Sequence, residues 1–282
     1  MTARLRLAKA PLCLLLGLAV FFGALLADPD PSLSTILVAL AVTVVAAGAA
    51  SLNSLQERNL DAKMERTRNR PIPAGYLTVR QATWQAAGLF IFGMLFLLKA
   101  STLAPTILTL CGVVLYNGVY TPLKRTTILA IIPGAVCGAI PAYVGWLDGG
   151  GPWLSFPVLL LFALFFLWQI PHFWLILLGH SRDYVAGDMP NLLNLVSESR
   201  LRRFFITWIG ALAIVMVLFV TLPYPLAAAA RPAIIVNALA LVGVFAVGLQ
   251  LGGKRKYRVL FRLLNGSLLL HMLIVGIGRV GG

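Results

Sequence analysis

Residues 33–75 read LSTILVALAVTVVAAGAASLNSLQERNLDAKMERTRNRPIPAG, in which an apolar run leads directly into a highly charged stretch. Residues 33–55 contain no Lys, Arg, Asp or Glu, whereas residues 53–75 hold twelve charged or amide side chains and two prolines. An α-helix of about 20 residues crosses roughly 30 Å of hydrocarbon, because each residue adds about 1.5 Å. The stretch therefore predicts a membrane helix that ends in a polar segment.

The composition extends this prediction to the whole chain. Of 282 residues, 60% are hydrophobic and 11% are charged, whereas an ordinary soluble domain has about 25% charged residues. The mean hydropathy of +0.91 excludes a soluble globule. Because a backbone in lipid must satisfy its own hydrogen bonds, the apolar runs are expected to be helices. We predict an all-α integral membrane protein.

Nine apolar runs long enough to span a bilayer recur along the chain. The first run follows Arg4, Arg6 and Lys9 and resembles a secretory signal, but it leads straight into further spans, so we expect it to be retained. No long linker divides the sequence, and we predict a single domain over residues 1–282. The predicted spans are residues 11–27, 33–55, 79–98, 102–118, 127–147, 153–178, 204–222, 231–251 and 259–279.

The basic residues predict the orientation of these spans. The N-terminal segment and the connections after the second, fourth, sixth and eighth spans together hold 20 of the 23 Lys and Arg residues. Under the positive-inside rule, this places the N-terminus in the cytoplasm and the C-terminus on the opposite side. The charge also favours contact with anionic membrane lipid. Nucleic-acid binding is disfavoured, because the basic residues are divided among several short connections.

Acids gather on the same predicted face, which the positive-inside rule does not explain. Asn53, Glu57, Asp61 and Glu65 recur every four residues, so they are expected to share one face of a helix that Pro71 and Pro73 would end. Neighbouring acids on that face repel unless a cation lies between them. Mg²⁺ with a bound polyphosphate fits this pattern, and a solvated helix face is the alternative. The interleaved cations, suited to binding phosphate, are Arg58, Lys63, Arg66, Arg68 and Arg70.

Two other connections on that face carry similar chemistry. The segment SRDYVAGDMP, residues 181–190, offers Asp183 and Asp188. The segment NGVYTPLKR, residues 117–125, adds Asn117, Tyr120, Lys124 and Arg125. We expect these connections to meet around a central cavity that opens toward the cytoplasm. His172 is a lone histidine in an apolar span. It could be a buried residue of the core or a residue of the functional site, and the residues alone leave both alternatives open.

Five motifs follow one another along nearly the whole chain: KMERTRNRPIPAG (63–75), YTPLKR (120–125), GAIPAYVGW (138–146), WQIPHF (168–173) and RDYVAGDMP (182–190). Together they resemble the UbiA superfamily of intramembrane prenyltransferases and, within it, the family of protohaem IX farnesyltransferases or haem O synthases. Glu57 departs from the usual aspartate of the first acidic motif of the superfamily, and Asp188 departs from the usual spacing of the second.

This resemblance implies a nine-helix UbiA-type bundle in a bacterial inner membrane. The implied reaction is Mg²⁺-dependent transfer of a farnesyl group from farnesyl diphosphate to a vinyl group of haem B, with a haem A synthase or terminal oxidase downstream. The implied roles are catalysis by Asn53, Asp61 and Lys124; metal binding by Asn53, Glu57, Asp61 and Asp183; diphosphate binding by Lys63, Arg66, Arg70, Tyr120, Lys124 and Arg125; and haem binding by Trp168, His172 and Tyr184.

Two other functions stay open at this point. One is a UbiA-type prenyltransferase that acts on an aromatic acid or a quinone precursor, which would prenylate a phenolic compound and form no haem O. The other is a membrane transporter, for which acids are expected near the middle of the bilayer, often beside broken helices. The clustering of acids at one face favours an enzyme.

Overall fold

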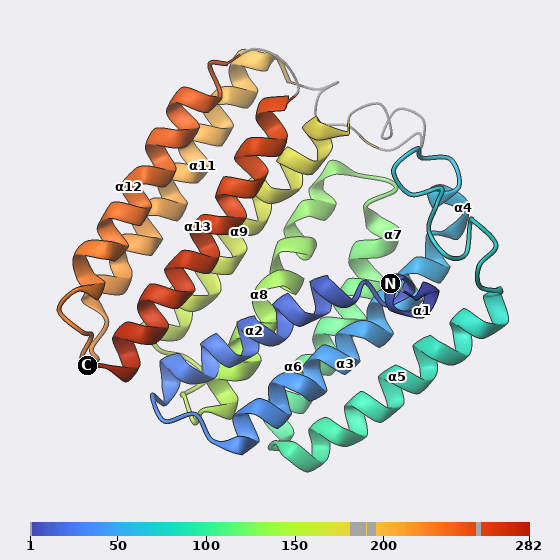
Figure 1. Cartoon of the computed structure of the whole chain (residues 1–282), viewed down its shortest axis with the longest axis horizontal. Helices are drawn as coiled ribbons and strands as arrows, with labels where there is room; N and C mark the ends of the chain where they lie inside the picture. The colour runs from blue at the N-terminus through green and yellow to red at the C-terminus, as the bar shows by residue number, and fades with distance from the viewer. Residues whose placement is uncertain (1, 181–189, 191–195, 252–254) are drawn as a thin grey trace.

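The computed structural model describes residues 2–180, 190, 196–251 and 255–282. All regular elements in these ranges are helical, and nine helices in the same ranges are long and apolar enough to cross a membrane (Figure 1). The predicted all-α membrane fold is therefore confirmed.

Most of the helices are long, and short 3₁₀ or π-helical segments extend several of them. In chain order they are α1 (Ala3–Leu7), α2 (Ala10–Ala27), α3 (Leu33–Gln56), α4 (Arg58–Asp61), α5 (Val79–Ala100), α6 (Leu103–Val113), the π-helix η1 (Val114–Tyr120), α7 (Thr121–Leu123), the 3₁₀ helix η2 (Ile128–Ala130), α8 (Ile131–Asp148), α9 (Phe156–Gly179), α11 (Glu198–Leu218), the 3₁₀ helix η4 (Phe219–Thr221), α12 (Ala230–Gly248) and α13 (Arg255–Val280).

The predicted spans agree with these helices to within a few residues at most ends. The fourth span is a composite, since α6, η1 and α7 together form one membrane-length helix over Leu103–Leu123. The ninth span begins at Arg255, before the predicted residue 259, because the basic residues that precede the apolar run are themselves helical. Hydropathy locates the hydrocarbon-crossing part of a helix but not its charged extension.

The helices pack as two groups that meet through the centre of the bundle (Figure 1). α11, α12 and α13 pack together beside α9, while α2, α3 and α5 pack on the other side and α8 joins α2 to α9. α3 and α9 end, and α11 and α13 begin, at the same end of the bundle (Figure 1). We call this the charged end, because the acid-bearing residues after α3 and the basic residues of α13 both lie there.

The central contact between α2 and α8 depends on two glycines. A Cβ atom on Gly23 would lie 1.9 Å from the Ala142 carbonyl oxygen, and one on Gly145 would lie 1.8 Å from the Val20 carbonyl oxygen. Small residues at helix contacts in membranes allow backbones to approach this closely. The two helices are therefore in backbone contact at a position that side chains would separate.

We expect Gly145→Ala to destabilise the bundle by about 2–3 kcal/mol, because the new methyl group must push α8 away from α2. The matched control is Gly243→Ala on α12, where an added Cβ meets no atom within 4 Å. Thermal unfolding of the two variants in detergent measures the difference. Equal unfolding temperatures for Gly145→Ala and the wild type would show that the α2–α8 contact contributes little.

Candidate active site

The last turn of α3 and the short helix α4 carry three polar side chains into the protein interior. Asn53, Glu57 and Asp61 are 0%, 4% and 3% exposed. The Glu57 amide donates to the Asn53 carbonyl, and the Asp61 amide donates to the Glu57 carbonyl. Helical spacing therefore persists across the junction between α3 and α4, and one face carries all three side chains.

The predicted continuation of this helix through residue 65 and up to the prolines is wrong. α3 ends at Gln56, α4 ends at Asp61, and no helix lies between there and the start of α5. The hydroxyl of Thr67 donates to the Asp61 carbonyl oxygen at 3.0 Å. In a continuing α-helix, that carbonyl would accept from the backbone amide of Glu65 instead. Glu65 consequently lies in an exposed turn and does not extend the buried face.

Cations from separate segments surround the two buried acids. The Lys124 ammonium forms an ion pair with Glu57 Oε1. Arg70 Nη1 lies 2.8 Å from both carboxylate oxygens of Asp61 and 3.8 Å from Glu57 Oε2. Burial by itself would raise the pKa of Glu57, but Lys124, Lys9 and Arg70 outweigh burial and hold that pKa below its usual value. Glu57 is therefore a carboxylate at neutral pH.

Lys9 also belongs to this cluster, and the sequence interpretation missed it. Its ammonium donates to Asn53 Oδ1 at 2.6 Å. Its backbone, between α1 and α2, has a φ of +50°, which is uncommon for a residue other than glycine. Burial, followed by the charges of Arg70 and Lys124, lowers the pKa of Lys9 to about 7 against the opposing effect of the nearby acids. The sequence interpretation missed Lys9 because the positive-inside rule alone accounts for a basic residue before the first span.

The π-helix η1 is tied to the end of α3 by side-chain amides. The Asn117 side chain donates to Gln56 Oε1 at 3.1 Å, and the Gln56 side chain donates to the Asn117 carbonyl at 3.0 Å. The Asn53 side chain donates to the Thr121 hydroxyl at 3.0 Å. π-helical turns occur frequently at functional sites. These bonds hold η1 and α7 against α3, so the cation that follows α7 lies beside the acids.

A row of rings leads from this cluster to α9. The Lys124 ammonium lies 5.2 Å from the centroid of the Tyr120 ring. Tyr120 stacks with Tyr116 and with Phe173, at centroid separations of 5.8 and 6.0 Å. Phe173 in turn meets the ring of His172 edge-on at 6.0 Å. The row therefore connects the acid–base cluster to the histidine that the sequence singles out.

The ring of His172 is oriented by two aromatic rings and one amide. The Trp168 and Phe261 rings lie 4.6 and 4.7 Å from its ring centroid. Asn265 Oδ1 is 3.0 Å from His172 Nδ1, and the Asn265 amide nitrogen donates to the Phe261 carbonyl at 2.5 Å. This second bond fixes the amide, so we assign the imidazole proton to Nδ1 and leave Nε2 free as a base or a metal ligand. Sequence interpretation missed Asn265, although an amide in an apolar span is itself a signal.

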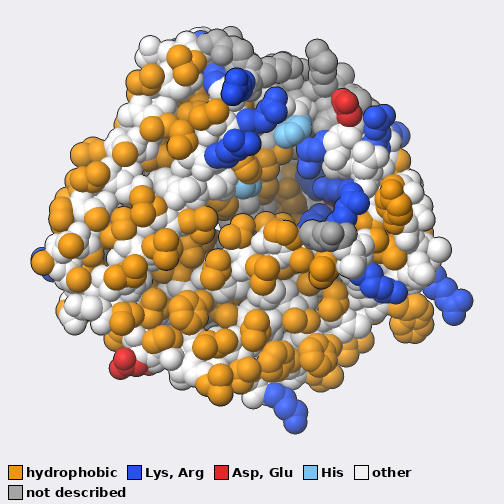
Figure 2. Space-filling model, in the orientation of Figure 1, with side chains coloured by type: hydrophobic (Ala, Val, Ile, Leu, Met, Phe, Trp, Pro, Cys, Tyr) orange, Lys and Arg blue, Asp and Glu red, His pale blue; other side chains and the backbone are white. Residues whose placement is uncertain are grey.

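The surface between these two clusters is hollowed. Figure 2 shows a depression with apolar walls, bordered by Lys and Arg side chains over the start of α13 on one side. On the other side, Lys and Arg side chains lie over α7 and the turns that follow α4, and histidine side chains lie at the border (Figure 2). A hollow of this kind suits an apolar ligand with an anionic group, since cations stand at the border and apolar side chains below.

Several predicted site residues lie outside the cluster. Lys63 and Arg66 are exposed on the turns after α4 and make no hydrogen bond or ion pair with the residues that the structure describes. Arg125 is directed at a carbonyl at the end of α3, to which its guanidinium donates at 2.5 Å. Tyr184 and Asp188 lie outside the described residues, so their roles stay predictions.

Asn53, Glu57 and Asp61 bring three buried oxygen-bearing side chains together, and within the described ranges they are the candidate metal ligands. In those ranges no group of three or more His, Cys, Asp or Glu side chains could hold a metal ion. Two carboxylates and an amide oxygen nevertheless suit Mg²⁺, which takes one or two protein carboxylates and completes its coordination with water and phosphate oxygens. The predicted fourth ligand, Asp183, lies outside the described residues.

Comparison with known proteins identifies the family. The model of the UbiA prenyltransferase family matches residues 15–269. The chain belongs to the UbiA prenyltransferase family. This UbiA prenyltransferase is 34% identical to the protoheme IX farnesyltransferase of Nitratidesulfovibrio vulgaris over 262 residues, which are 93% of this chain and 90% of the relative. It is 43% identical to the protoheme IX farnesyltransferase of Geobacter sulfurreducens over 205 residues, or 72% of this chain and 74% of the relative. The resemblance seen in the motifs is confirmed.

Solved structures confirm the UbiA fold. A digeranylgeranylglyceryl phosphate synthase aligns with a TM-score of 0.79 at 16% identity, covering 99% of this chain and 98% of the other. A UbiA homologue from Archaeoglobus fulgidus, bound to GPP and Mg²⁺, aligns with a TM-score of 0.71 at 16% identity over 97% of this chain and 99% of the other. The protein is a membrane prenyltransferase with the predicted UbiA-type bundle.

Proposed function

We propose that this UbiA prenyltransferase transfers the farnesyl group of farnesyl diphosphate to a vinyl group of haem B, giving haem O and diphosphate. The observation that carries the proposal is the row of stacked rings that joins a buried acid–base cluster to His172. One end of the row suits a diphosphate and the other suits an iron porphyrin. The relatives named protoheme IX farnesyltransferase support the same assignment.

The proposed chemistry develops charge at both ends of the row. The allylic C–O bond of farnesyl diphosphate breaks, and its electron pair leaves with the diphosphate. The vinyl group supplies the electron pair of the new C–C bond to C1 of the farnesyl group. Water then adds to the resulting carbocation on the porphyrin side chain, which gives the hydroxyl group and releases one proton. Catalysis therefore requires cations around the departing diphosphate. It also requires an enclosed apolar space around the farnesyl and vinyl carbons that form the new bond.

The cations of the acid–base cluster are the proposed ligands of the diphosphate. The Lys124 ammonium and the Arg70 guanidinium are already held beside the acids, and the half-buried Lys9 side chain lies at the same place. The stacked Tyr120 ring supports Lys124 from below. Lys63, Arg66 and Arg125 stay proposed ligands at the exposed border, where they would contact the diphosphate only after their side chains move.

Asn53, Glu57 and Asp61, with Asp183 as the predicted fourth ligand, would hold Mg²⁺ against the diphosphate. When bound, the ion would supply Lewis-acid stabilisation of the departing group. Asn53 Oδ1 accepts a hydrogen bond from Lys9 in this structure, so metal binding at that oxygen requires Lys9 to exchange this bond for one to the diphosphate. Among the residues assigned to catalysis, Asn53 and Asp61 thus fix the position of the leaving group, and Lys124 neutralises it.

The aromatic side chains and His172 would enclose the farnesyl chain and bind the acceptor, haem B. Tyr120 and Phe173 present aromatic faces along the path between the two substrates, which favours positive charge and excludes water. His172 would ligate the haem iron through Nε2, and Trp168 would lie against the porphyrin. Tyr184 stays a proposed haem contact.

The setting of the reaction follows from the same proposal. We propose that residues 1–282 act as one domain in the inner membrane of a bacterial cell, with the charged end and the N-terminus facing the cytoplasm. The concentration of basic residues at the charged end supports this orientation. The product would be consumed by a haem A synthase or a terminal oxidase.

The test is an assay of membranes that contain the protein, supplied with haem B, farnesyl diphosphate and Mg²⁺. We expect haem O to appear when the haems are extracted and separated. We also expect EDTA to stop its formation and excess Mg²⁺ to restore it, because the two buried acids bind diphosphate only through a metal. Formation of a prenylated phenol in place of haem O would support the other UbiA activity, and full turnover in EDTA would contradict the metal site.

A further inference from the structure

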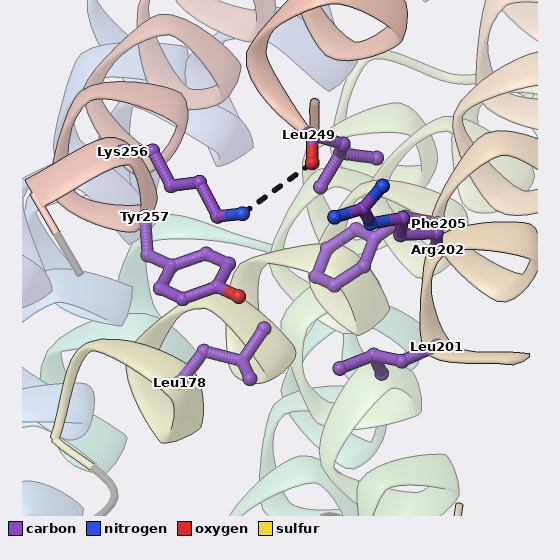
Figure 3. A pocket seen from close by; sticks show the side chains of 7 residues that line it. All are labelled: Leu178, Leu201, Arg202, Phe205, Leu249, Lys256 and Tyr257. Carbon is purple, nitrogen blue, oxygen red and sulfur yellow. Dashed lines mark hydrogen bonds between the residues drawn. The ribbon is translucent and has the colours of Figure 1, made fainter. Parts of the chain in front are cut away.

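Lys256 differs from Arg258 and Arg262 in its contacts, although all three lie near the start of α13. Arg255, also exposed, is the first residue of the helix and lies ten residues before Asn265. The Lys256 ammonium donates to the Leu251 carbonyl at 2.7 Å, and Figure 3 shows it directed at Leu249 in a crevice between α11, α12 and α13. Arg258 and Arg262, in contrast, are exposed and make no hydrogen bond or ion pair with the described part of the chain. Lys256 is thus occupied by backbone carbonyls of this protein, and the two arginines are available to a ligand.

The two arginines share a helix face with Asn265. The three residues follow one another at intervals of four and three, which places them on one side of α13. Leu260 and Leu264, 2% and 0% exposed, mark the opposite side, which packs into the bundle. Since the Asn265 side chain reaches the α9 histidine, the shared face borders the site.

The depth of Arg262 also requires an explanation. It is the eighth residue of α13, just past the second turn, and precedes the apolar part of a membrane-spanning helix. Arginine near membrane depth is costly unless it faces water, a partner group or a cavity. Figure 2 shows Lys and Arg side chains over the start of α13 on the border of the hollow, across from those over α7. The positive-inside rule accounts for the presence of these charges but not for their position on this face.

We propose that Arg258 and Arg262 bind the two carboxylates of the porphyrin acceptor and thereby set its orientation. This inference rests on the proposed function. Guanidinium groups bind carboxylates through paired, charge-assisted hydrogen bonds. Along α13, Arg262 is about 4.5 Å and Arg258 about 10.5 Å from Asn265, at about 1.5 Å per residue. An iron bound to His172 would therefore place the carboxylate edge of the macrocycle within reach of both guanidiniums.

The orientation has a consequence for the reaction. In haem B the two carboxylates lie on one edge of the macrocycle and the two vinyl groups lie toward the opposite edge. With the carboxylates bound at α13, the vinyl edge points across the hollow toward Glu57, Asp61 and Lys124. The two arginines thus direct a vinyl group to C1 of the farnesyl chain, and turning the acceptor over would exchange one vinyl group for the other.

The test compares haem B with its dimethyl ester, in which both carboxylates are neutral. Dissociation constants come from titration of the purified full-length protein in detergent, followed by the haem absorption band. We expect the wild type to bind haem B about 10- to 100-fold more tightly than the ester. We expect R258Q/R262Q to bind haem B as weakly as the wild type binds the ester, with its affinity for farnesyl diphosphate unchanged.

The matched control is Arg203→Gln, which removes an exposed cation from α11 at the same end of the bundle. An equal loss of haem affinity in Arg203→Gln, or wild-type affinity in R258Q/R262Q, would overturn the assignment of the arginines. If the wild type forms haem O while R258Q/R262Q retains its haem affinity, only this inference is wrong. If the wild type neither binds haem B nor forms haem O, the proposed function is wrong as well.

Discussion

Asp61→Asn is expected to lower farnesyl transfer by at least about 10³-fold. The substitution keeps the shape of the side chain but removes a full negative charge from the proposed metal ligands. Asp61 is 3% exposed, and both its carboxylate oxygens lie 2.8 Å from Arg70 Nη1. Solvent does not replace the lost charge, and the neighbouring acid Glu57 is already paired with Lys124. Initial rates of haem O formation at saturating substrates measure the effect.

The loss must be separated from unfolding, because breaking a buried ion pair destabilises a protein by several kcal/mol. Arg70 keeps Glu57 as a second partner at 3.8 Å, so we expect Asp61→Asn to insert and fold. The control is Glu65→Gln, at the next position of the same four-residue series. Because Glu65 is exposed in a turn, its substitution is expected to change turnover less than about twofold. Similar losses of turnover in Asp61→Asn and Glu65→Gln would show that turnover depends on the total negative charge of this region and not on a specific role of Asp61.

The length of the apolar runs predicted the spans, because the membrane itself sets the length and hydropathy that a spanning helix needs. A helix that crosses hydrocarbon needs a continuous apolar run, and each predicted run contains most of a helix. The end of α3 is different, since charged residues are equally compatible with a helix and with turns. Glu57 and Thr67 end α3 and α4 through a backbone bend and a side-chain hydrogen bond that no periodicity reveals.

The candidate site shows the same division. The i, i+4 spacing of Asn53, Glu57 and Asp61 predicted one shared face. The three side chains share that face because i, i+4 backbone hydrogen bonds continue from Asn53 through Glu57 to Asp61. Lys9 and Asn265 were missed for a different reason. Each reaches a partner on another helix, 44 residues away for Lys9 and 93 residues away for Asn265. Lys9 is an isolated lysine before the first span, and Asn265 is a single amide in the last span. Neither belongs to a repeating pattern from which its contact could be predicted.

Lys124→Met is expected to lower turnover by about 10²-fold, the second-largest effect at this site. Methionine keeps the length and apolar stem of lysine but cannot stabilise a departing diphosphate. Since negative charge on the diphosphate grows only as the C–O bond breaks, the loss should appear in kcat more than in KM. Steady-state kinetics over a range of farnesyl diphosphate concentrations separates the two.

The outcome decides between two roles for one ammonium group. In this structure Lys124 pairs with Glu57 Oε1 and lies over the Tyr120 ring, so it offsets a buried carboxylate that would otherwise be costly. If that were its whole role, Lys124→Met would lower stability and leave kcat near the wild-type value. If Lys124 also binds the leaving group, Lys124→Arg should recover part of kcat, because the positive charge returns. The recovery should be incomplete, because a planar guanidinium does not have the compact shape of an ammonium. Arg80→Gln, an exposed cation at the start of α5, is the control for the loss of positive charge at this end of the bundle.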